Sequence, residues 1–152
     1  MLIDLMKAED LPQVAEIEKD TFSEPWSEKG FADSLALGDT LFLCVTEENS
    51  ETGSSREVIG YCGLLQSFDT ADITNVAVRS DKRGCGIGRR MLTELMKLGR
   101  ERGVQQFTLE VRTGNSAAIH LYESLGFVSA GIRKGFYRKP AEDALIMWTE
   151  KQ

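Results

Sequence analysis

The residues with the clearest chemical potential form a basic, glycine-rich loop at positions 79–90, RSDKRGCGIGRR. Its glycines let the backbone turn sharply and approach a ligand closely. The first N–H groups and the dipole of a helix that starts here favour an anion, and the arginines add positive charge. These residues are Gly84, Gly86 and Gly88, with Arg83, Arg89 and Arg90. The pattern indicates a phosphate or pyrophosphate site, although a solvated basic turn before a surface helix has the same composition.

Two other kinds of glycine loop share part of this pattern. A dinucleotide-binding loop needs G-x-G-x-x-G, and its third glycine falls on Arg89 here, although Glu110 stands where its ribose-binding acid is expected. A methyltransferase loop needs an acid before the first glycine, where this chain has Lys82 and Arg83. Both also need a larger parallel sheet than the 64 residues after Gly88 can supply. We therefore disfavour both.

Hydrophobic periodicity predicts the elements that must position the loop. The predicted strands are 2–6, 40–46, 58–66, 73–78, 106–111, 128–132 and 144–149. The predicted helices start at Asp10, Ser27, Ile87 and Asn115, and glycines 38, 103 and 126 end the last three of them. Residues 47–57, with Gly53, are expected to be a hairpin loop. This order predicts an α/β fold, a mixed and mostly antiparallel sheet of about seven strands with about four helices, in one domain spanning residues 1–152.

Composition limits the partners. The chain has 18 basic and 24 acidic residues, a net charge of -6, which disfavours nucleic acid and suits a basic partner. Three cysteines without a CxxC pair provide neither a disulfide framework nor a zinc site, so no metal is expected. The charged N-terminal segment does not fit a signal peptide, and no apolar stretch is long enough to span a membrane. We expect a cytoplasmic protein without a membrane partner.

Several motifs in register resemble the GCN5-related N-acetyltransferase (GNAT) family. Arg83-x-x-Gly86-x-Gly88 resembles the family's [Q/R]-x-x-G-x-[G/A] pyrophosphate loop. Downstream, LEVR at 109–112, N-x-x-A at 115–118 and LYESLGF at 121–127 resemble its second half. Upstream, FSEPWSEKGF at 22–31 is similar to a subgroup that acetylates the N-terminal alanine of a small-subunit ribosomal protein. The resemblance covers residues 2–149 and implies the GNAT fold.

The resemblance also implies direct transfer of an acetyl group from acetyl-CoA to an amine. By this resemblance, Glu110 is the general base and Tyr122 is the general acid that protonates the CoA thiolate. Without the resemblance, Glu110 could equally be a solvated surface glutamate and Tyr122 a tyrosine packed in the core. Trp26 and Tyr137 become walls for the acceptor, the molecule that receives the acetyl group. The residues expected to bind acetyl-CoA are Val76, Ala77, Val78, Arg83, Gly84, Cys85, Gly86, Ile87, Gly88, Arg89 and Asn115.

Two other reactive residues are less suited to catalysis. A helical wheel places Tyr122 on the inward face and His120 on the solvent side. Cys85 lies in a basic loop but has no neighbouring base, so we do not expect it to be a nucleophile. The resemblance implies direct transfer without an acyl-enzyme. The segment 133–140 departs from the subgroup, which usually has asparagine near Gly135 and a second tyrosine at Phe136. Recognition of the acceptor is therefore the least defined part of the site.

The expected function is acetyl-CoA-dependent acetylation of the N-terminal alanine of a ribosomal protein, whose basic N-terminus suits the acidic chain. An α-amino group has a pKa of roughly 7.7–8.0, so a base is needed to keep it unprotonated. Two alternatives stay open: acetylation of a small amine such as a polyamine or an antibiotic, and a non-catalytic module that binds acyl-CoA. The second needs neither Glu110 nor Tyr122, and both are present.

Overall fold

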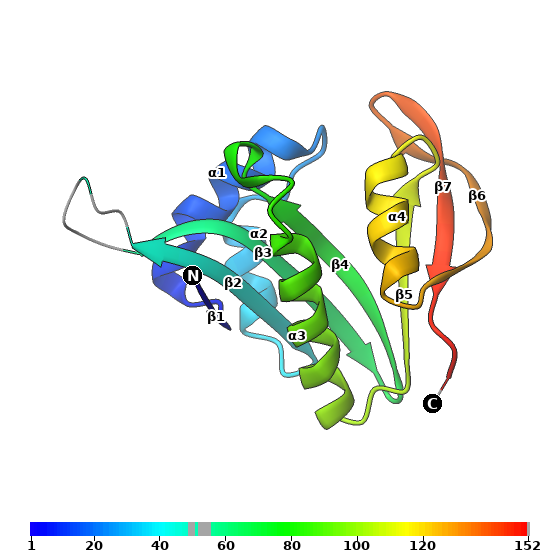
Figure 1. The fold of residues 1–152 in the computed structure, drawn as a ribbon, viewed down its shortest axis with the longest axis horizontal. Helices are drawn as coiled ribbons and strands as arrows, with labels where there is room; N and C mark the ends of the chain where they lie inside the picture. Colours follow the sequence, from blue (N-terminus) through cyan, green and yellow to red (C-terminus); the bar gives the residue numbers. More distant parts are fainter. Residues whose placement is uncertain (49–50, 52–55, 152) are drawn as a thin grey trace.

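The computed structural model describes residues 1–48, 51 and 56–151. A seven-stranded sheet runs through the molecule in the order β1-β2-β3-β4-β5-β7-β6 (Figure 1). Neighbouring strands are antiparallel except β4 and β5, which are parallel. The strands are β1 (Leu2–Leu5), β2 (Thr40–Glu48), β3 (Arg56–Ser67), β4 (Thr70–Val78), β5 (Gln106–Arg112), β6 (Val128–Arg138) and β7 (Ala141–Trp148). The predicted mixed sheet of the GNAT fold is confirmed.

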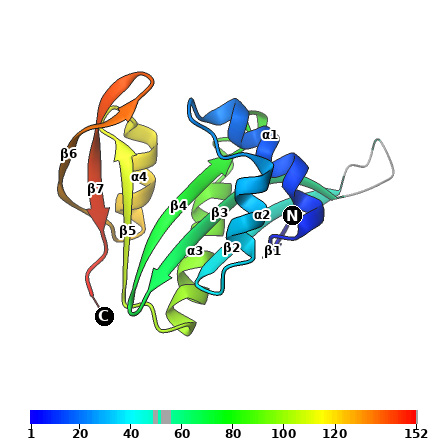
Figure 2. The same cartoon turned by 180° about the vertical axis from the view of Figure 1, so that it is seen from behind.

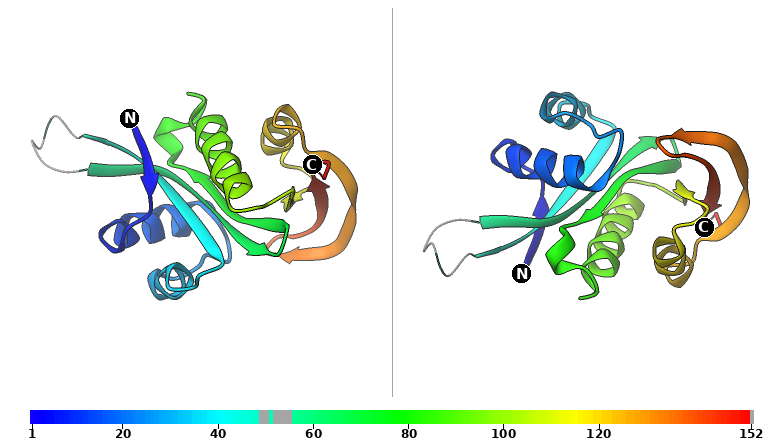
Figure 3. Two further views of the ribbon diagram at one scale, coloured as in Figure 1. Left: turned by 90° about the horizontal axis from the view of Figure 1, so that it is seen from below. Right: turned by 90° about the horizontal axis from the view of Figure 1, so that it is seen from above.

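Four α-helices cover the two faces of the sheet. Seen from behind and from its ends, α1 and α2 lie on one face while α3 and α4 lie on the other (Figures 2 and 3). Two cores result, one under α3 and α4 that includes Met91 and Phe107, and one under α1 and α2 that includes Val14 and Phe31. The helices are α1 (Leu11–Thr21), α2 (Glu28–Leu35), α3 (Ile87–Glu101) and α4 (Ser116–Ser124), with short 3₁₀ turns η1 (Ala8–Asp10) and η2 (Ser80–Lys82).

Local sequence explains where the helices begin. The Ser27 hydroxyl accepts a hydrogen bond from the Gly30 N–H at 3.0 Å, and the Asn115 side chain accepts one from the Ala118 N–H at 3.2 Å. Both caps were predicted, because serine and asparagine can satisfy N–H groups that a helix leaves unbonded at its start. Asn115 thereby fixes the start of α4, the helix that carries Tyr122.

Most of the observed strands are longer than predicted, whereas β1 ends one residue earlier, at Leu5. β4 begins at Thr70 instead of 73, and β6 continues to Arg138 instead of ending at 132. The basic, glycine-containing end of β6 does not alternate in hydrophobicity, yet it pairs with β7 through a register shift between Arg133 and Tyr137. Both ends of the predicted hairpin loop, 47–48 and 56–57, belong to strands β2 and β3. The centre of that loop, including Gly53, lies outside the described residues.

One extra residue in β4 changes which face its side chains meet. Gly63 lies opposite Asn75 and Leu64 opposite Ile73, so Thr74 is inserted as a bulge. Ile73 therefore points into the α3 and α4 core, whereas Asn75 contacts α1 on the other face. A strict two-residue alternation would place both side chains on the same face.

Candidate active site

The strands β4 and β5 separate after a short paired segment. Within the described residues, they are paired only through 70–72 and 106–108. Past that point, β4 is still bonded to β3, through Val76, Ala77 and Val78, but its other edge has no strand partner in the described part of the sheet. A free strand edge offers N–H and C=O groups to an extended ligand. Val76, Ala77 and Val78, three of the residues expected to bind acetyl-CoA, lie on this edge.

The basic glycine loop follows β4 directly. Gly84 and Gly86 have φ angles of 79° and 78°, the left-handed region that glycine occupies without a steric penalty. Gly86 is the N-terminal cap residue of α3, and no side chain bonds to the cap of this helix. An added Cβ at either glycine would meet no atom within 4 Å, so the loop has open space around it. This geometry, with Arg89 and Arg90 in the first helical turn, can hold a pyrophosphate.

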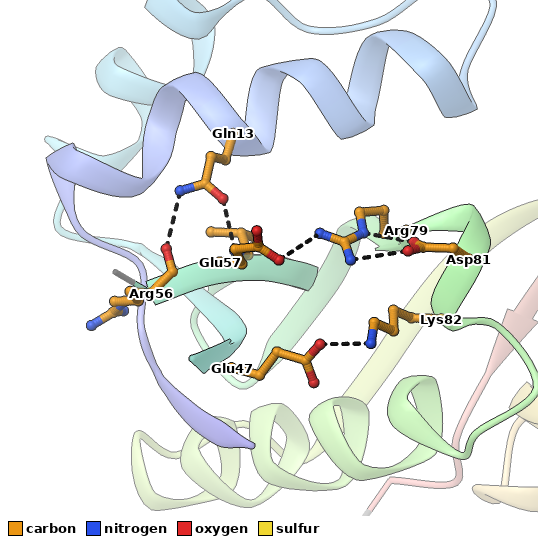
Figure 4. A network of polar contacts seen from close by, with 8 residues as sticks. Gln13, Glu47, Arg56, Glu57, Arg79, Asp81 and Lys82 are labelled. Atoms are coloured by element: carbon orange, nitrogen blue, oxygen red, sulfur yellow. Dashed lines mark hydrogen bonds and ion pairs between the residues drawn. The ribbon is translucent and has the colours of Figure 1, made fainter. Parts of the chain in front are cut away.

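Ion pairs anchor the start of this loop to the strands β2 and β3 (Figure 4). Arg79 holds Asp81 through two hydrogen bonds of 2.6 and 3.0 Å and also contacts Glu57 at 3.4 Å. Lys82 pairs with Glu47 at 2.6 Å. The Lys82 ammonium lowers the pKa of Glu47, and the Arg79 guanidinium lowers the pKa of Asp81. Two positive charges of the loop are thus neutralised within the protein.

The other three arginines of the loop differ from Arg79 in their contacts. Among the described residues, no carboxylate forms an ion pair with Arg83, Arg89 or Arg90. The Arg83 Nε–H donates to the Val78 carbonyl at 3.1 Å, which connects the loop to the end of β4. The positive charge that remains is therefore concentrated where the helix N-terminus already favours an anion.

Glu110 lies on β5 just past the last residue paired with β4. Its neighbours Leu109 and Val111 point into the α3 and α4 core, so Glu110 faces the α1 and α2 side. Its side chain is 32% exposed, and one carboxylate oxygen lies 3.2 Å from Nη1 of Arg133 on β6. Arg112, the nearest cation to Glu110 along β5, pairs instead with Glu142 at 3.1 Å.

Tyr122 approaches from the opposite face of the sheet. It is buried under α4, with its ring edge-on to Phe127 and the centroids 5.9 Å apart, as the helical wheel predicted. Burial raises the pKa of Tyr122 to about 12, and the negative charge that Tyr137 would carry contributes less. Tyr122 is thus kept protonated at neutral pH. Gly88 on α3 leaves room for α4, since a Cβ there would lie 3.1 Å from Leu121.

Tyr137 and Trp26 lie on the elements expected to contact the acceptor. Tyr137, on β6, is half-buried and stacks against the Arg112 guanidinium, 4.3 Å from its ring centroid. Burial raises the pKa of Tyr137, and the Glu110 carboxylate raises it further, so these two groups interact electrostatically. Trp26 lies just before α2, and its ring packs against Phe31 with the centroids 5.2 Å apart.

A buried polar group that the sequence did not predict lies beside Trp26. The carboxylate of Glu18 on α1 accepts hydrogen bonds from the Trp26 N–H at 3.0 Å, the Tyr61 hydroxyl at 2.8 Å and the Asn75 amide at 3.5 Å. Leu11, Val14 and Glu18 follow a helical period, so an acid on an apolar helix face was the signal available in the sequence. Arg133 offered no local signal for its contact with Glu110.

The other residues singled out in the sequence are Cys85, His120 and Asn115. Cys85 is exposed, with its thiol 3.8 Å from the Arg83 carbonyl, and His120 is exposed as predicted. Asn115 uses its side-chain oxygen to cap α4. Across the described ranges, no group of three His, Cys, Asp or Glu side chains could hold a metal ion. In the same residues, no helix combines the length and apolarity needed to cross a bilayer.

Comparisons with known proteins identify the family of the chain. The sequence model of the acetyltransferase (GNAT) family matches residues 11–127. The chain is 36% identical over 147 residues to a ribosomal protein bS18-alanine N-acetyltransferase of Escherichia coli (strain K12), covering 95% of this chain and 94% of that protein. The Haemophilus influenzae protein of the same name is 34% identical over 149 residues, covering 96% of both chains.

Solved structures give the same result. The crystal structure of the ribosomal-protein-S18-alanine N-acetyltransferase from Escherichia coli is similar, with a TM-score of 0.84 and 35% sequence identity. It covers 97% of this chain and 92% of that one. Ard1 from Thermoplasma volcanium shares the fold, with a TM-score of 0.82 at 24% identity. The chain belongs to the acetyltransferase (GNAT) family and is an N-acetyltransferase.

Proposed function

We propose that this chain transfers the acetyl group of acetyl-CoA to the N-terminal alanine of a small-subunit ribosomal protein. The observation that carries the proposal is that Glu110 lies where β4 and β5 separate, with Tyr122 on the opposite face of the sheet and the basic glycine loop directly after β4. Relatives named for this reaction align with almost the whole chain. The acceptor would be a basic N-terminus in the cytoplasm, and the net charge of -6 favours its approach.

Acetyl-CoA fits the residues beside the gap between the strands. In the proposal, the N–H groups at 84–88 and the unpaired arginines bind the pyrophosphate. The free edge of β4 takes the pantetheine arm as an added strand, and its N–H groups polarise the thioester carbonyl. Holding both substrates side by side supplies much of the rate, because a thioester is already activated.

Glu110 and Tyr122 carry the proton transfers of the proposed reaction. Glu110 accepts a proton from the α-ammonium group, directly or through a water molecule, and the free amine attacks the thioester carbon. A C–N bond forms, the C–S bond breaks, and Tyr122 gives its proton to the departing thiolate. The acetylated nitrogen then loses its second proton, which restores the Tyr122 phenol through solvent, and Glu110 releases its proton to water. The products are an N-acetylated peptide and CoA. The buried position of Tyr122 on the inward face of α4 supports this role, and the phenol carries its proton at neutral pH.

A peptide panel and a polyamine, each incubated with acetyl-CoA and followed by mass spectrometry, test the proposal. We expect acetylation of Ala-initiated basic peptides and none of the polyamine. Glu110→Gln is expected to lower kcat by about 10²–10⁴-fold, with acetyl-CoA affinity unchanged. Glu123→Gln, an exposed acid on α4, is the matched control. Polyamine turnover alone supports the small-amine alternative, whereas CoA binding without any turnover supports the binding module.

A further inference from the structure

Glu18 is a buried carboxylate that receives three hydrogen bonds from three different parts of the chain. Its residue is only 3% exposed. One oxygen accepts from the Tyr61 hydroxyl on β3 and the Asn75 amide on β4, and the other accepts from the backbone N–H of Trp26 before α2. Burying a carboxylate is costly unless hydrogen bonds satisfy it. These contacts, made by residues 8 to 57 positions away in sequence, meet that cost.

The second buried acid of the N-terminal region is held differently. Asp10 is 2% exposed and pairs with Arg56 at 3.2 Å. Among the described residues, no cation forms an ion pair with Glu18; its partners are neutral donors, one of them the main chain of Trp26. Asp10 thus holds the start of α1 to β3, whereas Glu18 holds the segment between α1 and α2 to the centre of the sheet.

These contacts fix Trp26 relative to β4. Asn75 directly precedes Val76, the first residue of the strand edge that is proposed to bind acetyl-CoA. The Trp26 ring is held separately, because it packs between Phe31 and Phe42 with centroid distances of 5.2 and 6.2 Å. A residue fixed at both its main chain and its ring can act as a rigid wall.

We propose that Glu18 is a positioning residue that holds Trp26 as a fixed wall of the acceptor pocket and so limits the pocket to a small N-terminal residue. The inference rests on the proposed function, since it assigns the size limit of that same site. Glu18 acts through Trp26 and does not touch the reacting atoms. Removing its contacts releases the main chain of Trp26, so that only Phe31 and Phe42 still hold the ring. The wall can then shift, and larger first residues enter the pocket.

Two substitutions separate positioning from charge. Glu18→Ala removes all three hydrogen bonds. Glu18→Gln keeps the shape: its amide oxygen can accept from Trp26, and its NH₂ group can face the Tyr61 oxygen. The Asn75 side-chain oxygen, now buried without a partner, becomes an acceptor for the same NH₂ group once the Asn75 amide rotates. Asp10→Ala is the matched control, because it removes a buried acid that does not contact Trp26.

The assay compares kcat/KM for two peptides that differ only in their first residue, alanine or leucine, with enzyme concentration corrected by acetyl-CoA binding stoichiometry. We expect Glu18→Ala to reduce the preference for alanine by about tenfold. Glu18→Gln and Asp10→Ala should keep it, even if Asp10→Ala lowers the melting temperature.

Equal activity loss towards both peptides in Glu18→Ala, or the same loss of preference in Asp10→Ala, would overturn the positioning role. A loss of preference in Glu18→Gln as large as in Glu18→Ala would also overturn it, since the charge would then be the determinant. Wild-type enzyme that acetylates neither peptide would instead refute the proposed function. If Glu18→Ala does not fold, Tyr61→Phe, which removes one of the three bonds, must still lower the preference.

Discussion

Gly63 on β3 has no room for a side chain. It lies opposite Phe42 on β2, and the ring of Phe42 covers the glycine. A Cβ built on Gly63 would clash with this ring, 2.8 Å from its Cζ and closer still to Cε1 and Cδ1. Phe42 is only 3% exposed, and its ring is surrounded by Phe31 and Trp26 at centroid distances of 6.3 and 6.2 Å. Gly63→Ala therefore forces the ring out of its position.

The expected cost follows from this packing. Overfilling a core costs about 1–3 kcal/mol, and losing a buried phenylalanine ring altogether costs about 3–5 kcal/mol. Since the ring must move but can stay partly buried, we expect Gly63→Ala to lower the free energy of unfolding by about 3 kcal/mol. For a chain of this length, that corresponds to a melting temperature lower by about 6–12 °C.

Urea unfolding followed by circular dichroism measures this change, with an unchanged slope showing that the unfolded state is the same. Gly38→Ala is the control, because a Cβ there meets no atom within 4 Å and its φ is not in the left-handed region. That variant should be unchanged or more stable by about 0.4–1 kcal/mol. The packing argument fails if the midpoints of the two variants agree.

Three further predictions concern the site. Tyr122→Phe should lower kcat by about 100-fold without changing acetyl-CoA affinity in calorimetry; a parallel loss of affinity would mean that Tyr122 only packs the core. Gly86→Ala, at a φ of 78°, should weaken acetyl-CoA binding more than it raises the peptide KM, and equal effects would contradict the assignment of the loop. The third concerns pH: burial raises the pKa of Tyr61, Tyr122 and Tyr137, to about 12 for Tyr122. The folded protein therefore keeps protons that the unfolded chain releases near pH ~10, and stability present below that pH is lost as the pH rises towards about 12. Phenolate absorbance should rise together with unfolding, and a tyrosine that ionises near pH ~10 in the folded protein would refute this.

The sequence predicts the fold and most of the site because those features are local. The hydrophobic period, the cap residues and the glycine loop can each be recognised within a segment of about fifteen residues. The structure confirms the helices, the caps at Ser27 and Asn115 and the inward position of Tyr122. The strand ends are less accurate where the alternation breaks, as it does at the Thr74 bulge.

Contacts between distant residues were not predictable in this way. Glu110 and Arg133 are 23 positions apart, and Glu18 and Asn75 are 57 apart. No local pattern predicts which cation or hydrogen-bond donor a carboxylate will contact, because the contact depends on the order and register of the strands. An acid on the apolar face of α1 was visible in the sequence, but its partners required the assembled sheet.

Because of the bulge at Thr74, the side chains of β4 that follow it point alternately into two different cores. After it, Val76 and Val78 pack against the core of α3 and α4, while Asn75 and Ala77 belong to the side of α1 and α2. Consecutive residues of one strand are thus exposed to two independent sets of neighbours. In the reaction we propose, substitutions beneath α1 and α2 would reshape the acceptor side while the opposite layer keeps its packing. A change of acceptor within this architecture therefore requires few compensating mutations around acetyl-CoA.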